Sequence, residues 1–167
     1  SDDHILGGRA GVGEGFRQMM DALELGRVNV AARGVGVAQR SLELALRYSQ
    51  ERKTFGKPIA QHQAIQFKLA DMATKIEAAR LLTLKAARMK DAGERSDLEA
   101  GMAKLYASEA GKEVVEDSFR IHGGYGYSKE YEIERLYRDA PLLLIGEGTS
   151  EIQRMVIGRT LLRRHKI

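Results

Sequence analysis

Apolar residues recur at helical spacing along most of the chain. In two long stretches the steps between apolar positions alternate between three and four residues, which places these side chains on one stripe of an α-helix. The two stripes consist of Val28, Ala31, Val35, Ala38, Leu42 and Ala45, then of Ile65, Leu69, Met72, Ile76, Ala79, Thr83 and Ala86. A third long helix is expected to continue through Leu98, Met102, Leu105, Tyr106, Ala110, Val114 and Phe119. No segment alternates with period two for long enough to indicate a sheet. The pattern predicts an all-α chain.

Proline, glycine and serine residues mark the helix boundaries. Pro58 and Pro141 both fall where a helical pattern is interrupted, as expected for a residue without an N–H donor. Gly93 is expected to end the second long helix. Ser96 is the predicted N-cap of the third, because its hydroxyl can accept from the first free amides.

Two shorter helices are expected after the third long one. They cover residues 133–139 and about 149–162, and the second carries Ile152, Met155, Val156 and Leu161. The most economical packing of these elements is an antiparallel (up-down) four-helix-type bundle. Gly34 and Gly36 inside the first helix each cost about 1 kcal/mol relative to Ala, so we expect a neighbouring element to approach closely there.

The first residues differ from the rest of the chain. Gly7, Gly8 and Gly11 lie in a stretch that fits a connecting segment, and the chain opens on Ser1 rather than on Met, which indicates a piece of a longer protein. We therefore predict a linker over residues 1–13. Residues 14–167 are long enough for one helical domain with its own core.

Composition and charge narrow the functional classes. The chain has no Cys, which excludes disulfides, thiolate metal sites and a cysteine nucleophile, and favours the cytoplasm or an organelle matrix. The longest aliphatic run, Leu142 to Ile145, is far short of the roughly 20 residues that cross a bilayer, so no membrane association is expected. The net charge of +4 comes with alternating signs along the chain. A basic excess near the last residues suits a helix C-terminus, and no nucleic acid is expected.

Three clusters are candidates for chemistry, and each also has an ordinary structural interpretation. The glycine turns at 11–15 and 122–126 do not fit the G-x-G-x-x-G pattern and follow no strand, which argues against a Rossmann site. They are either helix connections or places where backbone amides approach a phosphate. Residues 51–58, Glu-Arg-Lys-Thr-Phe-Gly-Lys-Pro, followed by Gln61-His62-Gln63, surround a Phe with cations. They form either a phosphate and aromatic-ring contact or a basic loop.

The third cluster is centred on Glu147. This carboxylate lies between Gly146 and Gly148, immediately before the last predicted helix. The small neighbours leave room for a ligand, as a general base requires. The alternative is an acidic residue that the helix dipole favours beside a Thr/Ser cap.

Taken in order, the three clusters are similar to a known family. Glu-Arg-Lys-Thr-Phe-Gly-Lys, then Ile-His-Gly-Gly-Tyr-Gly-Tyr, then Glu-Gly-Thr-Ser-Glu-Ile-Gln-Arg resemble the pattern of acyl-CoA dehydrogenases, and the likeness spans about residues 14–163. It implies the family's C-terminal helical bundle, with residues 1–13 leading from its middle β-domain. It also implies dehydrogenation of an acyl-CoA thioester to the trans-2-enoyl-CoA. In that reaction Glu147 takes the α-proton while hydride leaves the β-carbon for FAD.

The resemblance also assigns binding residues. Gly148 would line the thioester pocket, and Glu24 and Arg27 would contact the CoA part of the substrate, unless they are surface charges at a helix start. Gly26 stands where a minority of the family carries its base, so Glu147 has no rival. The implied FAD contacts are Arg52, Phe55, His62, Gln63, Arg120, Ile121, His122, Gly123, Gly124, Thr149 and Glu151. Arg120 departs from the usual Gln, and Gly146 replaces a frequent Tyr.

The same resemblance implies partners. Part of the flavin contacts in this family serve a neighbouring subunit, so a homo-oligomer, either a dimer or a tetramer, is expected. An electron-transfer flavoprotein is the implied electron acceptor. Two other hypotheses remain open at this point: an acyl-CoA oxidase or flavin monooxygenase of the same fold, and a non-catalytic helical bundle for assembly or nucleic-acid binding.

Overall fold

The computed structural model describes residues 4–167. Its helices are α1 (Gly15–Glu51), α2 (Gln63–Asp91), α3 (Asp97–His122), α4 (Glu132–Ile145) and α5 (Ser150–Arg164). Two short strands, β1 (Lys53–Thr54) and β2 (Lys57–Pro58), form an antiparallel hairpin between α1 and α2 in which Lys53 faces Pro58. Short 3₁₀ helices are η2 (Gly8–Gly11), η3 (Ile59–Gln61) and η4 (Gly123–Tyr127). The predicted linker thus contains η2, and its first three residues lie outside the described part.

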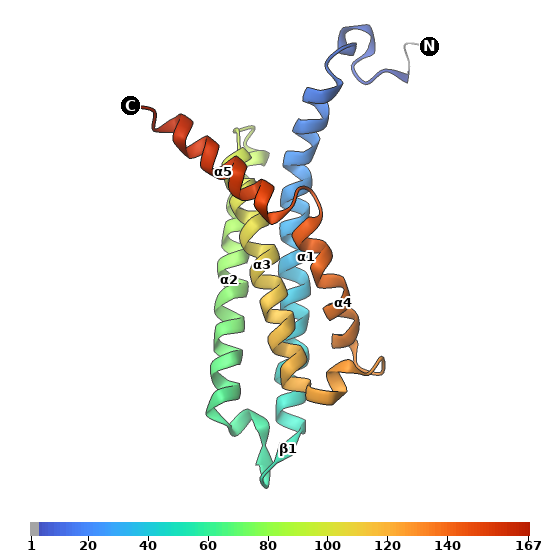
Figure 1. The fold of residues 1–167 in the computed structure, drawn as a ribbon, viewed down its shortest axis with the longest axis vertical. Coiled ribbons are helices and arrows are strands. Elements are labelled where there is room, and N and C mark those ends of the chain that lie inside the picture. Colours follow the sequence, from blue (N-terminus) through green and yellow to red (C-terminus); the bar gives the residue numbers. More distant parts are fainter. Residues whose placement is uncertain (1–3) are drawn as a thin grey trace.

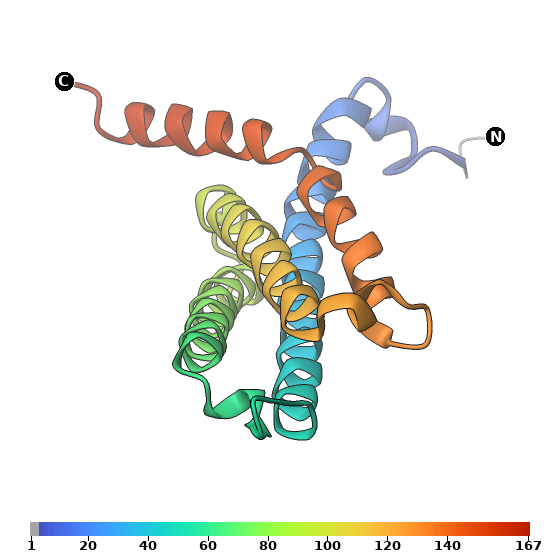
Figure 2. The same ribbon diagram turned by 60° about the horizontal axis from the view of Figure 1, so that its bottom comes forward.

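Helices α1 to α4 alternate in direction, which confirms the predicted up-down bundle (Figure 1). The hairpin of β1 and β2 closes the end at which α1 gives way to α2, and the junction of α4 and α5 lies toward the other end. Figure 2 shows α5 running outward from the bundle, over its end, rather than joining the four packed helices. Accordingly Ile152, Met155 and Leu161, predicted as its apolar positions, are 40–42% exposed.

The parallel helices α1 and α3 pack closely because their facing residues are small. A Cβ added to Gly34 would lie 2.8 Å from the carbonyl oxygen of Ala107, and the Ser118 hydroxyl donates to the carbonyl of Ser41 at 2.8 Å. The expectation of a close neighbour is therefore confirmed for Gly34. For Gly36 it is wrong, since this residue is exposed and an added Cβ would meet no described atom within 4 Å.

The apolar stripes predicted for α1 and α2 face the core, although Ile65 and Leu69 are only partly buried. The third long helix is confirmed as α3, but the large apolar residues expected along it are only partly on its buried face. Leu98, Ala110 and Val114 are buried, but Met102, Leu105, Tyr106 and Phe119 are not. Fully buried Ala100, Ala103 and Ala107 face the core instead, because the short distance to α1 leaves no room for longer side chains.

Two boundary residues behave differently from expectation. Ser96 is the N-cap of α3 as predicted, but its hydroxyl donates to Glu24 Oε1 at 2.5 Å instead of accepting from an α3 amide. Pro141 lies inside α4 rather than at a break. The helix continues through it because Ala140 and Leu143 on either side are buried against the bundle, and this packing outweighs one lost backbone hydrogen bond.

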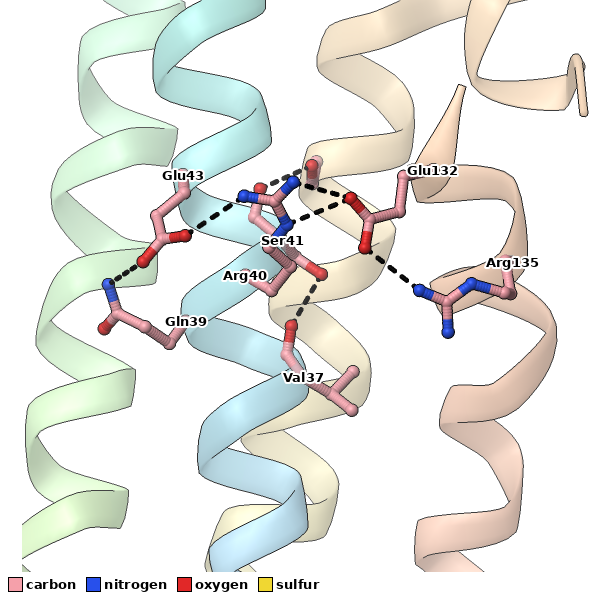
Figure 3. Close-up of polar contacts among 8 residues, drawn as sticks. Val37, Gln39, Arg40, Ser41, Glu43, Glu132 and Arg135 are labelled. Atoms are coloured by element: carbon pink, nitrogen blue, oxygen red, sulfur yellow. Dashed lines mark hydrogen bonds and ion pairs between the residues drawn. The ribbon is translucent and has the colours of Figure 1, made fainter. Parts of the chain in front are cut away.

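An ion pair fastens α4 to α1 (Figure 3). Arg40 donates from Nη2 and Nε to Glu132 Oε2 at 2.7 and 3.0 Å, and Arg135 binds the other carboxylate oxygen at 3.0 Å. Because both Arg40 and Glu132 are partly solvent-exposed, the pair orients α4 more than it stabilises the fold. Within residues 4–167, no helix combines the length and the apolar character needed to span a bilayer.

Candidate active site and cofactor pocket

Glu147 lies in the four-residue loop that joins α4 to α5. Its φ is +57°, and that of Gly148 is +91°, so two successive residues adopt the left-handed region that non-glycine residues rarely enter. The Glu147 carboxylate rests against α1 at Gly26, where an added Cβ would fall 2.5 Å from Oε2. The carboxylate therefore occupies the space that a side chain at Gly26 would fill.

Gln153 on α5 binds the backbone of this loop. Its side chain is fully buried, and Nε2 donates to the carbonyl oxygens of Glu147 at 3.0 Å and Gly148 at 3.2 Å. Thr149 caps α5 by accepting from the amide of Ile152 at 3.4 Å. Sequence reasoning missed Gln153. Its only signal was an amide side chain in the first turn of a helix, directly after the glycine-flanked acid.

Arg27 and Glu24 are buried on α1, so the surface-charge alternative is wrong for both. Arg27 is 5% exposed, and its Nε has no hydrogen-bond partner in the described chain. Glu24 accepts from the amide and hydroxyl of Ser96 at 3.1 and 2.5 Å and pairs with Lys90 at 3.4 Å. It thereby caps the positive end of α3. Arg27 retains donor capacity for a ligand, whereas the CoA contact of Glu24 stays a prediction.

A pocket of about 470 Å³ opens at the opposite end of the bundle. Its walls combine the end of α1, the hairpin and the glycine turn, and they consist of Tyr48, Arg52, Thr54, Ile59, Ile121, His122, Gly123, Gly124 and Tyr125. It thus unites Arg52 with the predicted cofactor residues Ile121 to Gly124. Arg52 lies with its guanidinium carbon 6.0 Å from the centre of the Tyr125 ring, a cation over an aromatic face.

His122 is held rigidly in the pocket wall. It is 4% exposed, its ring stacks on Tyr48 with centroids 4.4 Å apart, and Nδ1 lies 2.7 Å from the carbonyl oxygen of Ser118. Because a carbonyl only accepts, Nδ1 carries the proton and Nε2 is left as an acceptor. Burial lowers the pKa of His122, which favours the neutral imidazole.

The other predicted cofactor residues near this end lie around the pocket rather than in it. Phe55, at the hairpin tip, has a φ of +50° and is 96% exposed. His62 Nε2 is 3.0 Å from the Thr54 hydroxyl, and Gln63 is exposed at the start of α2. The Arg120 guanidinium turns along α3 to Glu116 at 2.7 Å, so this departure from the usual Gln does not line the pocket.

Thr149 and Glu151 belong to the Glu147 end instead. Hydrogen bonds, first from its own backbone amide and then from Thr149, hold the pKa of Glu151 below its usual value. Along α1, Gly26 and Arg52 are separated by roughly 39 Å at 1.5 Å per residue. The residues predicted to hold FAD therefore form two groups at opposite ends of the bundle.

The pocket suits part of an FAD molecule. A Cβ added to Gly123 or Gly124 would meet no described atom within 4 Å, so the turn leaves its backbone accessible to a ligand. The Arg52 guanidinium forms no ion pair among residues 4–167 and supplies donors for phosphate oxygens, while Tyr125 supplies an aromatic surface.

Comparison with known proteins identifies the family. The family model described as acyl-CoA dehydrogenase, C-terminal domain, matches residues 13–162. A probable acyl-CoA dehydrogenase of Bacillus subtilis strain 168 is 53% identical over 150 residues, which is 90% of this chain and 40% of that protein. The subunit CarC of the caffeyl-CoA reductase-Etf complex of Acetobacterium woodii is 51% identical over 153 residues, 92% of this chain and 40% of the subunit.

A solved structure shows the same fold. Butyryl-CoA dehydrogenase from Megasphaera elsdenii superposes with a TM-score of 0.89 and 47% identity, covering 90% of this chain and 39% of that enzyme. The chain thus spans about two fifths of the length of these relatives. The family model, the relatives and the fold agree, and the chain belongs to the acyl-CoA dehydrogenase family, matching its C-terminal domain.

Proposed function

We propose that this chain is the C-terminal domain of an FAD-dependent dehydrogenase that converts an acyl-CoA thioester to the trans-2-enoyl-CoA. The observation that carries this proposal is the Glu147 carboxylate, held by a left-handed loop against the bare backbone of Gly26. Glu147 takes the α-proton of the thioester. A positioned carboxylate suits this task because a general base must lie within hydrogen-bond reach of the proton that it removes.

The surrounding residues position the substrate in this proposal. A Cβ added to Gly148 would lie 2.8 Å from Nε2 of Gln153, so a contact of Gly148 with the thioester would use its backbone. Gln153 fixes the carbonyl groups of the loop, so the carboxylate does not need to be ordered during the reaction. The unpartnered donor of buried Arg27 supports a contact with an oxygen of the CoA portion.

FAD, when bound, accepts the hydride from the β-carbon. Thr149 and Glu151 lie beside Glu147 and would hold the FAD of that site. Arg52, which lines one pocket with Gly123 and Gly124, lies roughly 39 Å from Gly26 along α1, farther than one dinucleotide extends. We infer that the pocket lined by Arg52 and the glycine turn receives part of the FAD bound to a neighbouring copy. A homo-oligomer, either a dimer or a tetramer, would then complete each site.

The reverse reaction is a second candidate, favoured by the name of one relative. CarC belongs to a complex called caffeyl-CoA reductase-Etf, and dehydrogenation and enoyl reduction share one transition state. In the reductive direction Glu147 would deliver the proton to the α-carbon. The same name supports an electron-transfer flavoprotein as the redox partner. The oxidase and monooxygenase hypotheses have no such support.

The test uses the full-length enzyme with a panel of acyl-CoA thioesters and a dye as electron acceptor. Glu147→Gln should retain FAD and substrate binding but lose at least about a hundredfold in kcat, because its amide cannot accept the proton. Asp139→Asn, which neutralises an exposed carboxylate on α4, is the matched control. A Glu147→Gln enzyme that keeps more than about one-hundredth of the wild-type kcat would assign the base elsewhere.

Direction and acceptor are tested on the same enzyme. Enoyl-CoA reduction should show the same loss in Glu147→Gln as dehydrogenation, because one group serves both directions. Rapid reoxidation of the substrate-reduced enzyme by electron-transfer flavoprotein, with slow reoxidation by oxygen, is expected for a dehydrogenase. Fast reoxidation by oxygen would instead support an oxidase.

A further inference from the structure

The interior of the bundle contains a lysine that the proposed chemistry leaves unused. Lys104, near the middle of α3, has no solvent-exposed surface and is the largest fully buried side chain in the described chain. It lies in the stripe of small residues that includes Ala100 and Ala103. A lysine is almost never buried to this degree without a specific partner.

That partner is the end of the helix that leads to Glu147. Lys104 Nζ donates to the carbonyl oxygen of Leu144 at 3.1 Å. The last four carbonyl groups of a helix have no amide partner within the helix, and they form its negative end. The ammonium of Lys104 therefore satisfies one free carbonyl of α4 just three residues before Glu147.

The surrounding charges connect Lys104 to both sides of the site. Desolvation by burial lowers its pKa, Glu109 and Glu151 act in the opposite direction, and Arg27 adds to the lowering. Arg27 lies on α1 next to Gly26, and Glu151 lies in the first turn of α5. Lys104 is thus close to the residues that flank the Glu147 loop on either side.

The loop is consequently fixed at two points. Lys104 holds the carbonyl before it, and Gln153 holds the carbonyls of Glu147 and Gly148 within it. Both side chains are fully buried. A left-handed conformation at a non-glycine residue persists only where its surroundings impose it, and these two side chains supply that restraint.

We propose that Lys104 is a positioning residue that holds the end of α4 so that the Glu147 carboxylate stays against Gly26. This inference rests on the proposed function of Glu147 as the base. Lys104 does not touch the reacting atoms. Its contribution is to keep the carboxylate in place, and a displacement of about 1 Å of such a group costs on the order of a hundredfold in rate.

The experiment compares two variants of the full-length, FAD-loaded enzyme. Lys104→Met keeps the length and flexibility of the side chain but cannot donate, and it removes a buried charge that is dispensable for folding in many proteins. Ser108→Ala is the control: it deletes another fully buried polar group one turn along α3, whose hydroxyl donates to the carbonyls of Lys104 and Leu105.

The first measurement is amide hydrogen exchange by mass spectrometry, which is independent of turnover. In Lys104→Met, exchange over residues 144–149 should accelerate about tenfold or more, since a hydrogen bond to a charged group is lost. The bundle and Ser108→Ala should be unchanged. The second measurement is steady-state kinetics, in which kcat should fall about ten- to hundredfold while KM changes less than about threefold.

Each outcome decides the question. Wild-type loop exchange in folded Lys104→Met overturns the proposal, as does a loss confined to KM. If Lys104→Met does not fold, Lys104→Leu, which cannot donate either, provides the same comparison, and failure of both variants to fold beside a folded Ser108→Ala would overturn the proposal by showing a role in the whole bundle. If the wild-type enzyme dehydrogenates no acyl-CoA, the proposed function fails, yet the exchange data still report whether Lys104 anchors the loop.

Discussion

The carboxylate of Glu147 fills the space that a side chain at Gly26 would take. A Cβ on Gly26 would lie 2.5 Å from Oε2 and 2.6 Å from the carboxyl carbon of Glu147. These distances are well inside van der Waals contact, so the two positions cannot both carry a side chain in their present arrangement. The relationship links the first helix of the bundle to the last loop and makes the placement of the base depend on a glycine.

Gly26→Ala should therefore displace the base without unfolding the domain. The added methyl meets only the flexible end of a side chain, so the melting temperature should stay within a few degrees. The full-length enzyme should lose at least about tenfold in kcat. Gly36→Ala is the matched control, because that glycine is exposed on the same helix with open space before it. Wild-type turnover in Gly26→Ala would show that Glu147 does not act from this position.

Arg52→Ala should weaken FAD retention rather than the chemical step. Its guanidinium lines the pocket near the glycine turn, beside Tyr125, and has no carboxylate partner in the described residues. Loss of a charge-assisted contact with phosphate should raise the Kd for FAD about ten- to hundredfold, measured by titrating the full-length apoenzyme. Arg47→Ala, which removes an exposed cation paired with Glu51, should leave the Kd for FAD unchanged. Equal flavin content with a lower kcat in Arg52→Ala would contradict this role.

Gly34→Ala should destabilise the domain. The new methyl would fall 2.8 Å from the backbone carbonyl of Ala107, and that atom moves only if α1 and α3 separate. We expect a loss of about 1–3 kcal/mol in the free energy of unfolding, as for other overpacked cores. Gly36→Ala should instead stabilise the helix by about 0.5–1 kcal/mol. Urea unfolding of both variants measures the difference, and equal midpoints would contradict the tight packing of α1 on α3.

The helices could be predicted wherever large apolar residues mark the buried face. The stripe from Val28 to Ala45 is an example. On α3 the same reasoning selected Met102 and Leu105, but much of the buried face consists of alanine, glycine and serine. Small residues carry little hydrophobic signal, although they are what allows two helices to approach closely. The large apolar residues therefore predicted the presence of α3 correctly, but they predicted only part of its buried face.

The candidate site likewise contains residues that could be predicted from the sequence and residues that could not. The glycines around Glu147 and the absence of a side chain at Gly26 were visible in the sequence. Lys104 and Gln153 were not, because a polar residue at helical spacing resembles a surface position until its partner, a free carbonyl on a distant helix, is known. The resemblance implied that part of the FAD contacts serve a neighbouring subunit. Which residues belong to each group could not be predicted, since this depends on the length and direction of α1 in three dimensions.

The 167 residues expressed alone should fold but should not bind FAD. The bundle has buried apolar clusters between its helices, whereas in the proposed function part of each FAD site comes from outside this chain. Large apolar residues remain exposed on the surface of the chain, including Phe16 at 75%, Leu142 at 66% and Leu162 at 76%. This exposure favours self-association. We expect a helical circular dichroism spectrum and elution ahead of a monomer on gel filtration, without flavin absorbance. Flavin absorbance that survives gel filtration, together with dye reduction on addition of an acyl-CoA, would show that the helical domain alone forms the complete site.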